Sequence, residues 1–247
     1  MLQNFIGEVG TRGVPVAVVT GASGGVGAAC ARMLAKQGYA CLLLGRRQRR
    51  LAELADEIQA ETKGSVPACG LAVDLSVPGD IEQLSRDIHG LHSVGVLVLA
   101  AGITSGKTAV FEDAELQRIL QVNLIAPMLC ARHLLPLLNR SPDPYIINIA
   151  SRAGLIGFED RGLYGASKAA GIRYFDSLRA QAQGSGLRVT SICPGWVNTP
   201  MAAEGGCTLP PDKILQPDDV AAAVQWLICS PTRLVVRDLV LEVAPIH

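Results

Sequence analysis

The chain has 247 residues, a length that α/β folds reach as one undivided domain. Hydrophobic residues make up 49% of the sequence and aromatic residues only 4%, so a large core would be aliphatic and rich in alanine. Lys and Arg together number 22, as do Asp and Glu, and this balance argues against a nucleic-acid partner attracted by net charge.

Cysteine usage and the lack of targeting signals indicate the compartment. Seven cysteines are scattered without a C-x-x-C pair, which predicts free thiols in a reducing compartment. The four histidines form no metal-ligand pattern, so no metal site is predicted. The first ten residues lack the basic start and apolar core of a signal peptide, and no uninterrupted apolar run approaches the ~20 residues that span a bilayer. We therefore predict a cytoplasmic protein with no membrane partner.

Apolar runs of strand length alternate with amphipathic segments of helix length along the whole chain. The predicted strands are 14–20, 40–44, 68–73, 94–100, 145–149, 187–192 and 238–243. The predicted helices are 26–37, 49–61, 79–88, 112–139, 163–183 and 217–229. Strands that are apolar on both faces and alternate with helices are typical of a parallel sheet covered on both sides. The pattern predicts an α/β fold: a doubly wound (Rossmann) seven-stranded parallel sheet in a single domain over 1–247.

The helix predicted over 112–139 contains two prolines, Pro127 and Pro136. A proline inside a helix removes a hydrogen bond and bends the axis. Asn123 lies one turn before the first of them, so we expect a distorted backbone around it.

A glycine-rich turn, within VVTGASGGVGAACARML (18–34), joins the first predicted strand to the first predicted helix. Glycines let the backbone turn tightly and approach a ligand closely, and the free N–H groups at a helix start attract phosphate. The spacing T-G-x-x-x-G-x-G differs from the G-x-G-x-x-G dinucleotide fingerprint, and a tight connection without a ligand is the alternative. The residues expected to bind the cofactor here are Gly21, Ser23, Gly24, Gly25, Val26 and Gly27.

That turn resembles the corresponding motif of the short-chain dehydrogenase/reductase family, and further segments match the family in order. They are VDLS (73–76), LAAG (99–102), QVNL (121–124), the serine before YGASK (164–168), and CPGWVNTP (193–200). The resemblance covers nearly the whole chain. It implies an enzyme that moves a hydride between a nicotinamide cofactor and a small-molecule carbonyl or secondary alcohol.

The resemblance implies a catalytic role for four residues. Tyr164 would transfer the proton, Ser151 would hold the substrate oxygen, Lys168 would bind the nicotinamide ribose, and Asn123 would hold a water that relays protons to solvent. Tyr164 and Lys168 are four apart and share a helix face. A nearby ammonium, with the positive end of a bound nicotinamide, lowers a tyrosine pKa from its usual ~10. The alternatives are a surface tyrosine and lysine, a serine that caps a turn, and an asparagine that satisfies broken helix bonds.

The remaining cofactor contacts are implied by the same resemblance. VDLS would contact adenine, LAAG would follow the central strand, and CPGWVNTP would form a loop over the nicotinamide, with a substrate lid at about 199–217. The residues expected at these places, beside Tyr164 and Lys168, are Asp74, Leu75, Ala100, Ala101, Gly102, Pro194, Gly195, Val197 and Thr199.

Four arginines follow the second predicted strand in GRRQRR (45–50). This strand of a doubly wound sheet ends beside the adenine ribose, where an acidic residue selects NAD. Gly45 stands there instead, so we predict that Arg46, aided by Arg47, binds the 2′-phosphate of NADP(H). The positive charges of Arg49 and Arg50 at the start of a helix interact unfavourably with the helix dipole, and a bound phosphate would offset this. Four solvated arginines, or a nucleic-acid patch, are the alternatives.

The sequence departs from the family in several places. LAAG lacks the asparagine pair of N-N-A-G, Gly24 stands where NADP-dependent members often have a basic residue, and the C-terminus lacks a G-G ending common in 3-oxoacyl-carrier-protein reductases. Family members are usually dimers or tetramers built on the helices of Asn123 and Tyr164, so we expect a homodimer or homotetramer. The rival interpretation is a dinucleotide-binding regulator without turnover.

Overall fold

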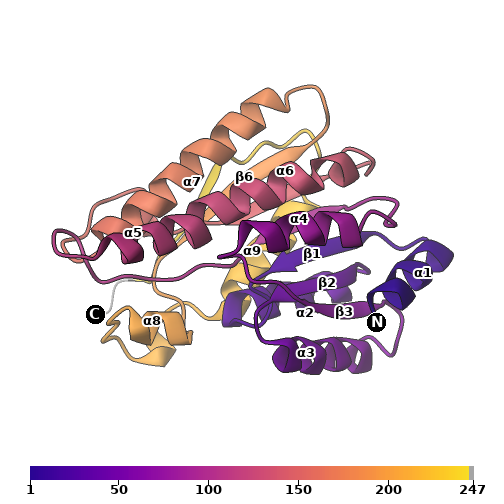
Figure 1. Ribbon diagram of the computed structural model, residues 1–247, viewed down its shortest axis with the longest axis horizontal. Helices are drawn as coiled ribbons and strands as arrows, with labels where there is room; N and C mark the ends of the chain where they lie inside the picture. Colours follow the sequence, from indigo (N-terminus) through magenta and orange to yellow (C-terminus); the bar gives the residue numbers. More distant parts are fainter. Residues whose placement is uncertain (245–247) are drawn as a thin grey trace.

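The computed structural model describes residues 1–244, and a seven-stranded parallel sheet forms its centre (Figure 1). The strand order is β3-β2-β1-β4-β5-β6-β7, which reverses direction between β1 and β4. The strands are β1 (Val16–Thr20), β2 (Ala40–Gly45), β3 (Ala68–Ala72), β4 (Val96–Leu99), β5 (Tyr145–Ile149), β6 (Arg188–Pro194) and β7 (Asp238–Leu241). The predicted doubly wound fold is thereby confirmed, with its switch point between β1 and β4.

Helices cover both faces of this sheet, and five strands are buried along their whole length. The helices are α1 (Leu2–Arg12), α2 (Gly25–Lys36), α3 (Gln48–Glu61), α4 (Pro78–Asp87), α5 (Asp113–Leu120), α6 (Ala126–Leu138), α7 (Gly162–Gln181), α8 (Pro200–Glu204) and α9 (Pro217–Cys229). One core layer packs α2, α3 and α9 against the sheet, and the other packs α1, α4, α6 and α7. This double covering explains why the strands read as continuously apolar rather than alternating.

The N-terminal helix α1 was not predicted. Its two buried side chains, Phe5 and Val9, are one turn apart and join the core layer of α4 and α6. The helix ends at Gly13, whose φ of +63° is a left-handed conformation that favours glycine. Arg12 donates hydrogen bonds of 2.6 and 3.3 Å to the carbonyls of Gly64 and Ser65. Tertiary contacts therefore stabilise a helix whose own sequence carries few helix signals.

The long helix after β4 is distorted at the predicted place. A π-helical turn, η1 (Gln121–Ile125), separates α5 from α6 and contains Asn123. The combined helix, Asp113–Leu138, has 26 residues and a mean hydropathy of 1.2 in its most apolar window, so its length and composition alone would allow it to cross a membrane. The buried core helix of a soluble protein passes the same test, and α6 packs in the core through side chains such as Cys130 and Leu134.

All seven cysteines lie in the described part of the chain, and none forms a disulfide. Five are buried in the core, where a thiol acts as a small hydrophobic group. The prediction of free thiols is confirmed.

Candidate active site

The carboxyl ends of six strands open into a cavity of 670 Å³ at the switch point of the sheet. Such a crevice is where doubly wound folds bind their ligands. Every predicted cofactor residue lines this cavity, and so does Ser151. Asn123 is the exception among the predicted site residues: it does not line the cavity, but its side chain accepts a hydrogen bond from Ile103, which does. Predicted residues that lie between positions 21 and 199 of the sequence therefore line the same cavity.

The glycine-rich turn after β1 has no room for side chains at two positions. Gly21 has a φ of +66°, and a Cβ added to it would lie 2.7 Å from the backbone nitrogen of Ala101. A Cβ added to Gly27 would lie 2.3 Å from the Gly21 carbonyl oxygen. No side chain caps the start of α2, whose N-cap is Gly24, and the first residues of the helix, 25–27, line the cavity. This geometry suits a phosphate group.

The ends of β2 and β3 carry charged residues that line the cavity. Arg46 and Arg47 line the cavity, and Arg47 also donates a hydrogen bond to the Ser23 carbonyl of the glycine turn. Hydrogen bonds from Ser76 lower the pKa of the Asp74 carboxyl, with a smaller effect from Arg46. The Arg46 guanidinium therefore lies near Asp74, at the edge where the second strand ends.

We predicted that a bound phosphate would offset the unfavourable interaction of Arg49 and Arg50 with the helix dipole. The structure instead pairs both arginines with carboxylates. Arg49 pairs with Glu53 at 3.0 Å, and Arg50 pairs with Glu53 and Glu57, both at 3.3 Å. These carboxylates lie one and two turns further along α3. They satisfy both arginines, so only Arg46 and Arg47 of the cluster face the large cavity.

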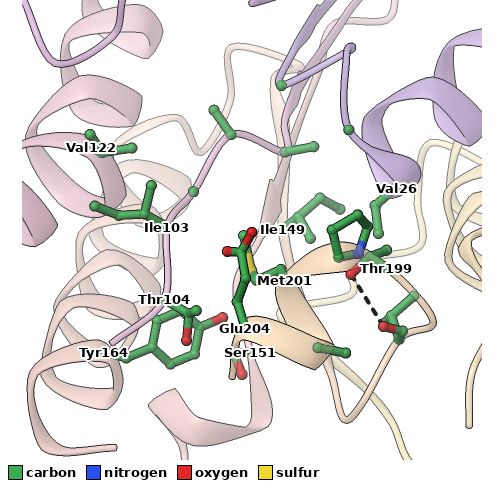
Figure 2. Close-up of a pocket in the computed structure, with 18 of the residues that line it drawn as sticks. Val26, Ile103, Thr104, Val122, Ile149, Ser151, Tyr164, Thr199, Met201 and Glu204 are labelled. Carbon is green, nitrogen blue, oxygen red and sulfur yellow. Dashed lines mark hydrogen bonds between the residues drawn. The ribbon is translucent and has the colours of Figure 1, made fainter. Parts of the chain in front are cut away.

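Ser151 and Tyr164 line the inner end of the cavity, and Figure 2 shows their side chains close together. Ser151 also accepts a hydrogen bond of 3.1 Å from the Ala153 N–H, so the alternative role of capping the following turn is observed as well. Burial raises the pKa of the Tyr164 hydroxyl, while the nearby Ser151 hydroxyl and the Arg161 charge lower it. In the protein alone, desolvation outweighs this hydrogen bond and this charge. The predicted lowering also requires the positive end of a bound nicotinamide, and it stays a prediction.

Lys168 is buried beneath Tyr164 on the same face of α7. Its Nζ lies 5.8 Å from the centroid of the Tyr164 ring and donates a 3.1 Å hydrogen bond to the Ile149 carbonyl. Burial lowers the pKa of Lys168 from 10.5 to about 8. The surface-residue alternative for this pair is therefore wrong.

The lowered pKa of Lys168 predicts a pH-dependent stability. As the pH rises from about 8 toward 10.5, the folded protein releases this proton while the unfolded chain keeps it. The unfolded state then binds more protons, so the free energy of unfolding increases with pH in that window. We expect this increase for the cofactor-free wild type relative to Lys168→Met in urea titrations. Parallel pH profiles for the two proteins would contradict a buried ammonium.

Asn123 connects the π-helical turn to the loop after β4. Its Oδ1 accepts from the Ile103 N–H at 2.8 Å, and its Nδ2 donates to the Ile103 carbonyl at 2.9 Å and to Ser167 Oγ at 3.1 Å. The side chain therefore positions the 103 loop against α7. Pro127, four residues further, has no N–H to donate to the Asn123 backbone carbonyl, which leaves that carbonyl without its usual helical partner.

The loop of 193–200 is held between β7 and the segment before α9. Gly195 N–H donates to the Leu241 carbonyl at 2.7 Å, and Asn198 N–H donates to the Leu215 carbonyl at 2.7 Å. At the LAAG segment, Thr20 Oγ1 accepts a 3.2 Å hydrogen bond from Ala101 N–H. A hydroxyl from β1 thus supports this turn, which lacks the asparagine pair of the family.

Several cavity residues were not predicted. They come from four segments of the chain: Ile103, Thr104, Arg118, Val122, Phe158, Arg161, Trp196, Met201 and Glu204. Figure 2 shows Glu204 projecting from α8 into the space beside Tyr164 and Met201. Val122, Trp196, Met201 and Glu204 lie inside segments that the sequence singled out, but none of them was named as a site residue. No local motif distinguishes the other five.

A doubly wound parallel sheet with a glycine-rich turn and a clustered serine, tyrosine and lysine at its switch point defines a nucleotide-binding oxidoreductase. Residues 15–207 match the family model described as short chain dehydrogenase, so the chain belongs to the short-chain dehydrogenase family. It is 31% identical over 230 residues to an uncharacterized oxidoreductase of Staphylococcus epidermidis, an alignment that covers 92% of this chain and 96% of the relative.

Solved structures show the same relationship. An alcohol dehydrogenase from Thermococcus sibiricus, complexed with 5-hydroxy-NADP, has a TM-score of 0.85 and 28% identity, over 94% of this chain and 99% of that chain. A single-residue variant of the actinorhodin polyketide ketoreductase, solved with NADPH, has a TM-score of 0.82 and 27% identity, over 94% of this chain and 96% of that chain.

Proposed function

We propose that the protein is an NADP(H)-dependent oxidoreductase that interconverts a carbonyl compound and a secondary alcohol. The observation that carries this proposal is the convergence of Ser151, Tyr164 and Lys168 at one end of a cavity whose other end is lined by Arg46 and Arg47. The NADP(H) complexes of the similar alcohol dehydrogenase and ketoreductase support the choice of cofactor.

The residues present fit a dinucleotide. The tight turn at Gly21 and Gly27 has no room for a Cβ atom, so the backbone there can approach a ligand closely. The start of α2, which no side chain caps, suits the pyrophosphate. Asp74 and Leu75 would flank the adenine, and the loop of Pro194, Gly195, Val197 and Thr199 would cover the nicotinamide. Ala100, Ala101 and Gly102 would lie against the ribose. When bound, the nicotinamide supplies or accepts the hydride.

Tyr164 is the proposed general acid and base. Burial raises its pKa, so the hydroxyl is protonated at neutral pH and can donate to a carbonyl oxygen during reduction. Ser151 lies beside it and would hold the same oxygen. The Lys168 ammonium below the ring would stabilise the phenolate that remains after donation. The Asn123 backbone carbonyl, freed by Pro127, could hold the water that returns a proton from solvent.

The proposal extends to the surroundings of the site. The segment 199–217, with the short helices α8 and η3 (Pro211–Lys213), would act as the substrate lid. The protein would assemble as a homodimer or homotetramer through α5, α6 and α7. Its partner is a small molecule rather than nucleic acid or membrane, and its compartment is the reducing cytoplasm.

Cofactor preference provides the first test. Fluorescence titration should show tighter binding of NADPH than of NADH, because a guanidinium can hold the 2′-phosphate with charge-assisted hydrogen bonds. We expect Arg46→Ala to weaken NADPH binding by at least about tenfold and to change NADH binding much less. Arg49→Ala is the matched control, because Arg49 is 94% exposed and pairs with Glu53 outside the cavity. Equal losses for both cofactors in Arg46→Ala would remove the 2′-phosphate assignment, and no binding of either cofactor would overturn the proposed function.

A further inference from the structure

Arg161 is a buried cation in the part of the cavity that the proposed cofactor residues do not line. Its side chain is 9% exposed and lies among Trp196, Gly106 and Gly206. It precedes α7 as the N-cap residue, three positions before Tyr164. The catalytic end of the cavity therefore continues directly to this guanidinium.

Residues 1–244 give this arginine only two long polar contacts. Arg161 lies 3.5 Å from the carboxylate of Asp160, which is 65% exposed, and 3.5 Å from the Ser105 carbonyl. A guanidinium has five N–H donors, and burying its charge without close partners is costly. The start of a helix also disfavours a positive charge. Two long contacts compensate little of this cost.

Arg188 shows how the same chain satisfies a structural arginine. It is buried to the same degree, 8% exposed as a residue. It forms a double contact with Asp143 at 2.8 and 3.1 Å, and donates to the carbonyls of Leu227 and Ser230 at 3.1 and 3.3 Å. Both arginines stack on an aromatic ring, Arg188 at 4.2 Å from the Tyr145 centroid and Arg161 at 5.3 Å from that of Trp196. Among the described residues, the one anion near Arg161 is the exposed Asp160 carboxylate at 3.5 Å, and of these two arginines only Arg161 lines the cavity.

We propose that Arg161 binds a carboxylate of the substrate, so that the protein acts on oxo acids or the corresponding hydroxy acids. The planar fork of a guanidinium matches the two oxygens of a carboxylate. The chain between the carboxylate and the reacting carbon would lie along the apolar surfaces of Phe158, Trp196 and Met201. The inference rests on the proposed function for the reaction, but not for the binding of the anion.

The other charges nearby make this site selective. Glu204 projects into the cavity beside Tyr164 (Figure 2) and would repel an anion placed there. Arg152 lines the same space, but it pairs with Glu242 at 3.3 Å and lies over the Phe158 ring. The cavity is therefore not uniformly positive, and Arg161 is the only buried arginine among those of the described residues that line it.

Matched substrates test the inference in turnover. The pairs are 4-oxopentanoate, 5-oxohexanoate and 6-oxoheptanoate, each beside its methyl ester, with NADPH. We expect kcat/KM for the acid to exceed that for its ester by about 100-fold for at least one chain length. This ratio corresponds to the typical contribution of hydrogen bonds between charged groups. Arg161→Gln should bring this ratio near one, Arg161→Lys should keep part of it, and the control Arg152→Gln should keep most of it. Esters as good as the acids at every length, or an equal loss in Arg152→Gln, would overturn the inference.

Binding of unreactive ligands separates this inference from the proposed function. Calorimetry with the NADP-saturated protein should show tighter binding of hexanoate than of hexanamide, and Arg161→Gln should abolish the difference. If no carbonyl compound is reduced but the hexanoate preference depends on Arg161, the proposed reaction fails and the anion site stands. If neutral ketones are reduced and the wild type shows no preference for hexanoate, the anion site fails and the reaction stands. The wild-type preference can be measured even if the variants fail to fold.

Discussion

Tyr164→Phe is expected to lower kcat for NADPH-dependent carbonyl reduction by about 10²- to 10⁴-fold, the usual contribution of general acid–base catalysis. The substitution removes only the hydroxyl that would donate the proton, and the ring keeps its place above Lys168. NADPH binding should therefore change by less than about threefold. Steady-state kinetics and a fluorescence titration of the same preparation measure the two effects.

A second tyrosine on the same helix provides the control. Tyr174 packs edge-on against Phe175, with ring centroids 5.1 Å apart, and does not line the cavity. Tyr174→Phe should keep kcat within about twofold of wild type, because it removes no group near the site. If Tyr164→Phe has wild-type kcat, Tyr164 is not the proton donor. If the wild type binds NADPH but turns over no carbonyl compound, the regulator interpretation replaces the enzyme.

Arg188→Met is expected to lower the free energy of unfolding by about 2–3 kcal/mol, because it removes a buried guanidinium and leaves two carbonyl acceptors without their donor. Its carboxylate partner Asp143 is 41% exposed, so it remains solvated after the substitution. Arg188 is buried, and its guanidinium joins Asp143 before β5 to the carbonyls of Leu227 and Ser230 at the end of α9. Its loss leaves these acceptors without a donor and removes the stack on Tyr145. Urea unfolding of the two proteins measures the difference.

An exposed ion pair of the same chemical type is the comparison. Arg173 is 77% exposed and lies 3.7 Å from Asp176, so Arg173→Met should cost less than about 1 kcal/mol. Equal costs for the two variants would mean that burial does not set the value of these pairs. Because Arg188 does not line the cavity, its variant should bind NADPH normally below its unfolding transition.

The order of strands and helices was predictable from the chain because it depends on local periodicity. Each predicted boundary lies within two residues of the observed one, as at β5, where the predicted 145–149 is the observed strand. The distortion around Asn123 was also predictable, since Pro127 breaks the local hydrogen-bond pattern. Helix α1 escaped prediction because Gly7 and Gly10 weaken its intrinsic helix preference, and contacts with distant segments stabilise it.

The four arginines of GRRQRR show where local reasoning stops. All four follow the same strand, and the sequence suggested phosphate for each pair. The structure turns Arg46 and Arg47 toward the cavity and pairs Arg49 and Arg50 with glutamates of α3. The direction of each side chain depends on its position around the first turn of the helix, which a small shift of the helix start would change.

The sequence by itself determined the fold class, the glycine-rich turn and the spacing of Tyr164 and Lys168, because each is a pattern among near neighbours in the chain. Only the tertiary structure decided which buried arginine is structural and which faces the cavity. Arg188 forms an ion pair with Asp143, which lies 45 positions away in the sequence. Arg161 lies over the ring of Trp196, which follows β6. The free energy of a buried charge depends on the groups that the fold brings around it, and those groups lie far apart along the chain.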